Sequence, residues 1–171
     1  MNVSWKVLLL LTLLCGCQNK CSSSHSKMGP EEVVEAYLNI ALNMNHVSQK
    51  YELMEYTTSN LKAALAGATD ETIMEAYIDR QYKFERFSLV GREDITPRET
   101  QISFQLAYSE LPHDHEKKPD GSEAEDTAIT TENTVSLTRE NGMWFISDVV
   151  GNKTAFDFPI SELSRITPSS H

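Results

Sequence analysis

The sequence predicts an α+β protein whose first half forms helices and whose second half forms an antiparallel β-sheet. Three observations support this fold class. Apolar residues between positions 30 and 78 recur at spacings of three and four, which is the period of an amphipathic helix. Aromatic and branched residues dominate between positions 82 and 150, where they alternate with polar ones. An Asn-Gly dipeptide divides the last of these runs, and it favours a tight β-hairpin.

The helical half begins at Pro30, because proline is favoured in a first helical turn. An apolar stripe then predicts one amphipathic helix of about four turns. Its members are Val33, Val34, Tyr37, Leu38, Ala41 and Leu42.

Shorter helices are expected to follow. Residues 47–56 predict the first of them, and three of its apolar residues are available for the core: Tyr51, Leu53 and Met54. The next helix should end near Gly67, because glycine suits the left-handed stop position. Thr69 and Asp70 can cap a further helix that carries apolar residues up to position 78.

The strand half starts with residues 82–90, whose imperfect alternation suggests a β-bulge near Glu85 and Arg86. A turn is expected from Gly91 to Pro97. The next run alternates cleanly and predicts a strand with four buried residues: Ile102, Phe104, Leu106 and Tyr108.

The last two strands are expected over residues 128–138 and 143–150, after a polar, mostly acidic loop at 111–126. Asn141 and Gly142 join these strands, since a two-residue hairpin turn needs positive φ at both positions and these residues tolerate it. Strict alternation from the turn places three side chains on one face. They are Trp144, Ile146 and Asp148.

Composition restricts the classes of function. The chain has 171 residues, enough for one domain with appendages, and a formal net charge of −10. Its lysines and arginines form no cluster, which argues against nucleic acid as a partner. The acidic balance also repels anionic membrane surfaces, so any membrane attachment must depend on something other than charge.

The N-terminus has the features of a secretion signal. Lys6 precedes an apolar run over residues 7–14, and the small residue Gly16 precedes Cys17. This run is shorter than the roughly 20 apolar residues that cross a bilayer, so a permanent transmembrane helix is not expected.

Residues 14–17, Leu-Cys-Gly-Cys, resemble the bacterial lipobox. The resemblance implies cleavage before Cys17 and fatty acylation of this cysteine on its sulfur and its new amino group. An ordinary cleaved secretory signal is the alternative. Gln18 stands where some bacteria read an aspartate as an inner-membrane retention mark, so the resemblance favours the outer membrane, with the domain facing the periplasm.

The chain is therefore expected to have four parts. These are a signal peptide at 1–16, a lipidated cysteine with a flexible tether at 17–29, one domain at 30–158 and a tail at 159–171. After Cys17 the single thiol is Cys21, in the tether. A disulfide scaffold, a thiol enzyme and a cysteine-ligated metal site are thus excluded for the domain.

Two stretches of the domain carry a further resemblance. The first helix opens with Pro-Glu-Glu-Val-Val-Glu-Ala-Tyr-Leu at residues 30–38, and the hairpin reads Arg-Glu-Asn-Gly-Met-Trp-Phe-Ile-Ser-Asp-Val at residues 139–149. With the order of the elements, they resemble the nuclear transport factor 2-like superfamily, which contains ketosteroid isomerases. The resemblance implies a curved antiparallel sheet wrapped around the first helices as a cone that can hold a pocket. Members include enzymes, small-molecule binders and interaction modules, so the fold does not select a function.

Asp148 is the candidate catalytic residue. A desolvated carboxylate at the mouth of the cone would have a raised pKa and could act as a general acid or base, as in the ketosteroid isomerases that the resemblance brings in. Tyr37, Tyr108 and Trp144 are further candidates for binding a ligand there. The alternative is that Asp148 ends a strand at the rim and bonds to the backbone or to an arginine such as Arg92.

His113 and His115 are candidate metal ligands, because alternate residues of an extended segment project to the same side. The alternative is a solvated loop, since no third ligand is held by adjacent structure. No cofactor is predicted.

These features predict a lipid-anchored protein of the bacterial cell envelope with a non-catalytic binding or interaction domain. The alternative is small-molecule binding or isomerase-like chemistry in the cone. Expected partners are the membrane, through the lipid, and an envelope protein or a small apolar ligand. The resemblance also implies a homodimer formed through the sheets, using outward apolar residues such as Phe87 and Phe145.

Overall fold

The structure is a computed structural model that describes residues 25–110 and 127–150. Its helical half consists of η1 (His25–Lys27), α1 (Pro30–Leu42), η2 (Val47–Gln49), α2 (Lys50–Glu55), α3 (Ser59–Gly67), α4 (Asp70–Ile73) and η3 (Met74–Ile78). Its strand half consists of β1 (Tyr82–Thr96), β2 (Glu99–Glu110), β3 (Thr127–Glu140) and β4 (Met143–Val150). η1 and η2 are single 3-10 turns, and η3 continues α4 as a π-helical segment.

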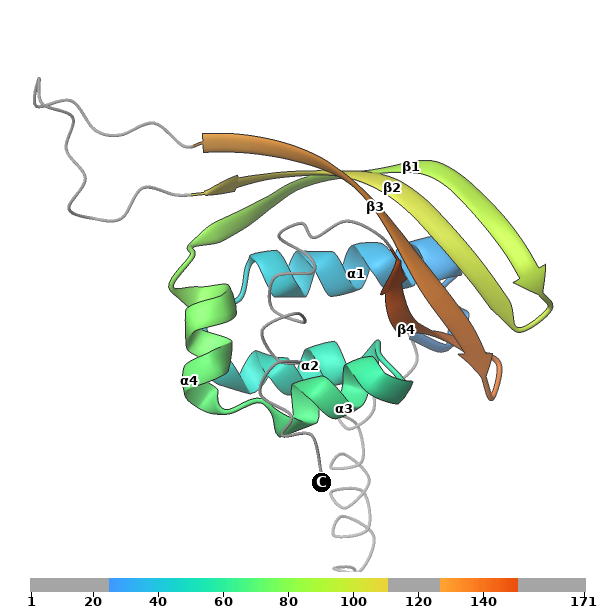
Figure 1. Cartoon of the computed structure of the whole chain (residues 1–171), viewed down its shortest axis with the longest axis horizontal. Coiled ribbons are helices and arrows are strands. Elements are labelled where there is room, and N and C mark those ends of the chain that lie inside the picture. Colours follow the sequence, from blue (N-terminus) through green and yellow to red (C-terminus); the bar gives the residue numbers. More distant parts are fainter. Residues whose placement is uncertain (1–24, 111–126, 151–171) are drawn as a thin grey trace, which may run out of the picture.

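The strands form one antiparallel sheet in the order β1-β2-β3-β4. Figure 1 shows this sheet arching over α1, with α2 and α3 on the side of α1 that faces away from the sheet. The short helix α4 lies at one end of the helical layer. The α+β class is confirmed, and so is the curved sheet over the first helices that the resemblance implies.

α1 forms as its sequence predicts. Pro30 occupies the first helical position, and the backbone N–H of Gly29 donates to the carboxylate of Glu32 at 2.7 Å. The predicted apolar stripe is buried along its whole length. Tertiary packing of this stripe is the main source of helix stability, because an isolated helix of this length is marginal in water.

The shorter helices lie where they were predicted, with one difference in the core. Thr69 caps α4, since its hydroxyl accepts the N–H of Thr72 at 3.2 Å. Leu53 of α2 is fully buried, but Tyr51 is 63% exposed and does not join the core. Positions two apart on a helix point in different directions, so one short helix cannot bury both side chains.

The left-handed stop predicted at Gly67 is wrong. The chain leaves α3 through Ala68, which has an extended backbone (φ −67°, ψ 132°). Lys50 holds this exit: its Nζ is nearly buried, donates to the Ala68 carbonyl at 2.9 Å and lies 3.5 Å from the Asp70 carboxylate. The Lys50 side chain of α2 thus donates to a carbonyl at the end of α3. In a helix that ends at a left-handed glycine, backbone N–H groups satisfy the last carbonyls instead.

β1 is longer and more irregular than expected. The predicted bulge is present, because Phe84 and Arg86 pair with consecutive residues of β2 and leave Glu85 as an extra residue. The turn predicted from Gly91 is wrong, since β1 continues to Thr96. Two further register shifts, at Val90 and Ile95, accommodate the broken alternation inside the strand.

β2 and the β3–β4 hairpin agree with the prediction. All four predicted residues of β2 are buried: Ile102, Phe104, Leu106 and Tyr108. Asn141 and Gly142 have φ of 51° and 87°, as a two-residue primed turn requires. Trp144 and Ile146 face the core from β4.

The two edges of the sheet differ. The free edge of β4 is covered, because the N–H of Thr58 donates to the Ile146 carbonyl at 3.0 Å and the N–H of Ile146 donates to the Tyr56 carbonyl at 2.9 Å. β1 is the opposite, outer strand.

Residues 25–29, predicted to belong to the flexible tether, are part of the folded domain. The ring of His25 packs against Tyr56 and Phe145, with ring centroids 4.9 and 5.1 Å apart, and its Nε2 lies 3.0 Å from the Trp144 carbonyl. Phe145 is therefore partly covered within its own chain. Phe87 is not an outward residue either, because it packs against the buried Phe104 at 5.2 Å. Both phenylalanines are thus partly covered by contacts within their own chain.

Candidate functional site

Side chains fill the interior of the cone in the described part of the chain. Tyr37, Tyr108 and Trp144, predicted to line a ligand pocket, are 1%, 4% and 9% exposed. They belong to the same hydrophobic core as Phe104 and Ile146, which are fully buried. This packing occupies the space that an interior ligand would need and does not support small-molecule binding or isomerase-like chemistry inside the cone.

Two tyrosines in this core, from α1 and η3, influence each other's ionisation. Burial raises the pKa of Tyr37 to about 12, and the neighbouring Tyr77 hydroxyl opposes part of this rise. Burial also raises the pKa of Tyr77 well above its usual value, and Tyr37 adds to the rise. Both phenols therefore stay protonated at neutral pH, which suits packing rather than proton transfer.

Asp148 lies on the opposite face of β4 from the buried Ile146, so its predicted position at the cone mouth is wrong. Ile146 pairs with Leu137 and Asp148 pairs with Ser136, which leaves Ser147 as an extra residue in β4. A one-residue bulge reverses the facing of every later side chain. The Asp148 carboxylate is exposed and accepts the N–H of the next residue at 2.8 Å, in agreement with the alternative in which it bonds to the backbone.

The antiparallel register brings the β1–β2 turn and the β3–β4 turn to the same end of the sheet, since Glu99 pairs with Thr138 (Figure 1). A hollow of about 420 Å³ lies there, which we call the tip cleft. Its lining residues are Arg92, Asp94, Ile95, Thr96, Pro97, Arg139 and Trp144. The tip cleft combines two guanidinium groups, one carboxylate and an indole with aliphatic surface.

The charge of Arg92 is balanced within the chain. Its Nη1 lies 3.0 Å from a carboxylate oxygen of Glu31 on α1, and its Nε lies 2.8 Å from one of Asp94. The hydrogen bond from Arg92 lowers the pKa of Asp94, so this carboxylate is ionised at neutral pH. The three groups form one network at the side of the tip cleft.

Arg139 is held differently. It lies directly opposite Trp144 in the hairpin, and its guanidinium carbon is 5.7 Å from the centroid of the indole ring. Its Nε donates to the Gly142 carbonyl at 3.3 Å. Among residues 25–110 and 127–150, no carboxylate forms an ion pair with Arg139.

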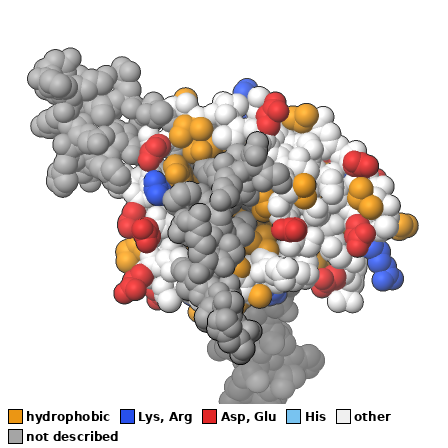
Figure 2. Space-filling model, in the orientation of Figure 1, with side chains coloured by type: hydrophobic (Ala, Val, Ile, Leu, Met, Phe, Trp, Pro, Cys, Tyr) orange, Lys and Arg blue, Asp and Glu red, His pale blue; other side chains and the backbone are white. Residues whose placement is uncertain are grey.

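The second half of the outer strand β1 exposes apolar side chains, and one of them, Ile95, lines the tip cleft. Leu89, Val90 and Ile95 are 50%, 63% and 51% exposed, and Val90 and Ile95 are the extra residues of two bulges. Three large apolar side chains are thus exposed within one half of a strand. Figure 2 shows the general character of one face of the molecule, where apolar side chains reach the surface among acidic ones.

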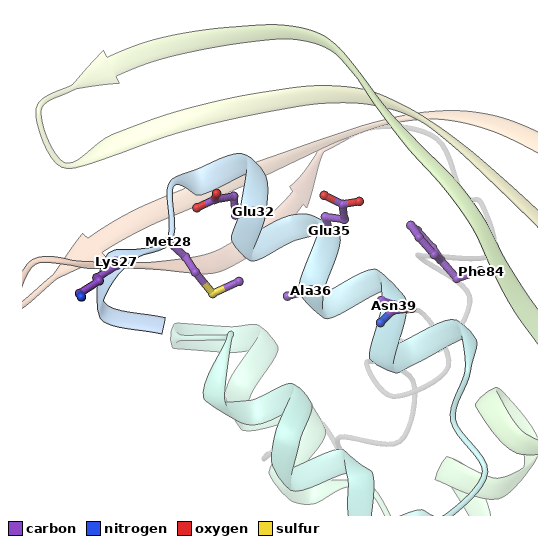
Figure 3. A pocket seen from close by; sticks show the side chains of 7 residues that line it. All are labelled: Lys27, Met28, Glu32, Glu35, Ala36, Asn39 and Phe84. Carbon is purple, nitrogen blue, oxygen red and sulfur yellow. The ribbon is translucent and has the colours of Figure 1, made fainter. Parts of the chain in front are cut away.

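A second hollow, of about 680 Å³, runs along the solvent-facing side of α1. Figure 3 shows that successive turns of α1 supply four of its lining residues: Glu32, Glu35, Ala36 and Asn39. Lys27, Met28 and Phe84 complete the lining. One of its two carboxylates, Glu32, already caps α1. The tip cleft differs from this hollow in that two guanidinium groups and an indole line it.

Neither Arg139 nor Ile95 was predicted from the sequence to be a site residue. The sequence could have indicated Arg139, because a two-residue turn at Asn141 and Gly142 places Arg139 opposite Trp144 in the hairpin. No local pattern brings Ile95 to the same place. Its position depends on the pairing of β1 with β2 and of β2 with β3.

Three of the predicted site residues, Cys17, His113 and His115, lie outside the described residues. In the two described ranges, no group of three or more histidine, cysteine, aspartate or glutamate side chains is arranged to hold a metal ion. No helix in these ranges is long and apolar enough to span a membrane.

No protein-family model matches the chain, and no curated protein sequence matches it. Solved structures with a similar fold include an Ntf2-like protein involved in plasmid conjugation, with 9% identity over 71% of this chain and 48% of that one and a TM-score of 0.44. This chain thus spans about half the length of that protein. Another is VirB8 of Agrobacterium tumefaciens, with 13% identity, coverage of 74% and 96%, and a TM-score of 0.40. A third is a putative polyketide cyclase of Pseudomonas putida, with 16% identity, coverage of 78% and 97%, and a TM-score of 0.38.

Proposed function

We propose that this protein is a lipid-anchored, non-catalytic binding domain of the bacterial cell envelope that holds a partner protein close to the membrane. The partner binds what we call the tip surface, which consists of Leu89, Val90 and the tip cleft. The observation that carries this proposal is the exposure of Leu89, Val90 and Ile95 within one half of β1. Single exposed apolar residues are ordinary, but their grouping on a small domain is typical of an interaction site.

The shape of β1 favours recognition of side chains over addition of a strand. A strand that joins a sheet needs a regular row of backbone donors and acceptors along the edge. The register shifts at Glu85, Val90 and Ile95 interrupt that row, and such bulges protect sheet edges from unwanted pairing. The partner therefore docks on the apolar side chains and the tip cleft.

The anchor in this proposal is Cys17. Several acyl chains on one residue give stable attachment, whereas a single chain gives only marginal membrane binding. The lipobox resemblance and Gln18 favour the outer membrane, with the domain in the periplasm. Because the folded domain already includes His25, few residues separate the lipid from it. The partner is thus held near the membrane surface.

Site-specific photocrosslinking in intact cells tests the interaction. A photoreactive phenylalanine analogue replaces Ile95 in one strain and, as a control, Tyr51 of α2 in another; both side chains are more than half exposed, at 51% and 63%. We expect a discrete crosslinked species from position 95 that is absent from position 51 and weakens when Val90→Glu is added. Equal products from both positions, or none from position 95, would contradict the proposal.

A further inference from the structure

We infer that the tip cleft is a carboxylate-recognition site that takes an aspartate or glutamate side chain of the partner together with the apolar residue next to it. This inference rests on the proposed function, since it names the chemistry by which the tip surface selects its partner. It assigns the main recognition role to Arg139.

The two arginines of the tip cleft differ in their partners. Arg92 already faces two carboxylates, at 3.0 and 2.8 Å, and has little capacity left for an external anion. Arg139 makes no ion pair with a carboxylate of the described chain, and the face of Trp144 supports its guanidinium. A guanidinium 5.7 Å from the centroid of an aromatic ring is attracted to the ring face and still offers donors that a carboxylate can accept.

The charged groups of the tip cleft indicate the charge of its ligand. The described lining contains two cations and the carboxylate of Asp94, and Glu31 lies on the same arginine as Asp94. These two cations and two carboxylates sum to zero, but both carboxylates pair with Arg92, so Arg139 is the cation of the lining that has no ion pair within the described residues. A singly charged carboxylate matches this one guanidinium, whereas phosphate groups carry more charge and are usually bound by several cations or backbone donors.

The size and polarity of the tip cleft limit what it can bind. A volume of about 420 Å³ accommodates one or two side chains of a peptide rather than a folded element. Ile95 is 51% exposed at the rim, and Pro97 is exposed beside it. An apolar side chain next to the acidic residue would cover these surfaces and exclude water from the ion pair, which strengthens it.

The test uses the mature lipoprotein in detergent, because cleavage before Cys17, as proposed, removes Trp5 and leaves Trp144 as its single tryptophan. The probe is a synthetic peptide with blocked ends and the sequence Ser-Gly-Leu-Glu-Leu-Gly-Ser, compared with the same peptide carrying glutamine in place of glutamate. Binding is followed by Trp144 fluorescence and by the indole N–H signal in NMR spectra. We expect the glutamate peptide to bind at least about tenfold more tightly, since a charge-assisted hydrogen bond is worth that factor.

Variants of this protein locate the effect. Arg139→Gln should remove the difference between the two peptides, Arg139→Lys should restore part of it, and Arg86→Gln should leave it unchanged. Arg86 is an exposed arginine in the first half of β1 and does not line the tip cleft, so it controls for general loss of positive charge. Thermal unfolding of each variant shows that it is folded.

Any other result with the two peptides contradicts the inference. Equal binding of the two peptides, no binding of either at millimolar concentration, or an equal loss in Arg86→Gln would overturn it. If photocrosslinking from position 95 succeeds while the peptides are not distinguished, the proposed partner binding stands and the carboxylate inference fails. If the peptides are distinguished but no crosslink forms in cells, the proposed function fails instead.

Discussion

The hydroxyl groups of Tyr37 and Tyr77 are polar atoms inside an otherwise apolar core. Both side chains are nearly inaccessible to solvent, at 1% and 5% exposure. Tyr77 belongs to η3, a π-helical segment, which is a rare conformation that occurs mostly as a single turn within α-helices. Buried polar groups are costly without a partner, so each hydroxyl depends on the arrangement of the other.

This dependence predicts a non-additive double-mutant cycle. Tyr37→Phe and Tyr77→Phe should each lower the free energy of unfolding by about 1 kcal/mol, because each leaves the other hydroxyl without its neighbour. The double variant should lose less than the sum, by about 0.5 kcal/mol or more. Urea unfolding of the four proteins measures the coupling. Additive losses would show that the two hydroxyls do not interact.

The same residues predict sensitivity to alkali. Burial raises the pKa of Tyr37 and of Tyr108 to about 12, while unfolded tyrosines ionise near 10. Below about pH 10 both states are protonated; above it the unfolded state loses its protons first, so stability falls as the pH rises from about 10 towards 12. Tyr37 alone accounts for about 2–3 kcal/mol of this loss.

The melting temperature as a function of pH measures this loss. Tyr37→Phe should make the fall above pH 10 shallower, because one of the groups responsible is gone. Tyr51→Phe is the matched control, since it removes a hydroxyl from a side chain that is 63% exposed rather than buried. A fall of unchanged steepness in Tyr37→Phe would contradict the assignment.

At the scale of elements, the β3–β4 hairpin is the part of the fold with the clearest local cause. Asn141 and Gly142 both have positive φ, and Arg139 and Trp144 then face each other across the turn. The turn therefore sets the geometry of the tip cleft as well as the register of the hairpin. The other glycines of the described chain have negative φ, so replacing one of them with alanine does not force a side chain into the left-handed region.

A pair of glycine substitutions separates these effects. Gly142→Ala should destabilise the protein by about 1–2 kcal/mol, because a side chain disfavours the left-handed backbone even in open space. Gly67→Ala should stabilise it by about 0.5–1 kcal/mol, since Gly67 lies in α3 with no atom near its added methyl group. Denaturant unfolding measures both changes. A shift of the same sign in the two variants would refute this account of the turn.

At the scale of the whole molecule, the two edges of the sheet are used in opposite ways. The segment from Tyr56 to Thr58 covers β4, whereas β1 is the outer strand, carries three register shifts and exposes apolar side chains. Covering one edge and bulging the other limits strand addition and leaves side chains available for recognition. Attachment through Cys17, as proposed, would keep this surface at the membrane.

Anchoring predicts a specific labelling pattern. Cys17→Ser should abolish metabolic labelling of the protein by palmitate in its native cells, because it removes the only proposed acylation site. Cys21→Ser should leave the labelling unchanged, since Cys21 lies in the tether. Gel fluorography of the three proteins measures the effect. Labelling that persists in Cys17→Ser would refute the lipid anchor.

Much of the fold could be predicted because its causes are local. Proline and glutamate start α1, a regular apolar stripe buries one side of it, and the Asn-Gly turn closes the last hairpin. The clean alternation of β2 likewise predicted its four buried side chains. In each case the residues within one element determine its conformation. The sequence alone therefore determined the order of the elements, the α+β class and the composition of most of the core.

The site depended on tertiary structure, because pairing decides where alternation is interrupted. Ser147 becomes an extra residue only through the pairing of β4 with β3, and this moves Asp148 to the outer face. The bulges at Val90 and Ile95 depend in the same way on β2. Tyr37 from α1 and Trp144 from β4 belong to one core that fills the cone, and the sheet register brings Arg139 and Ile95 together in the tip cleft. These contacts join segments far apart in the chain, so no local pattern contains them.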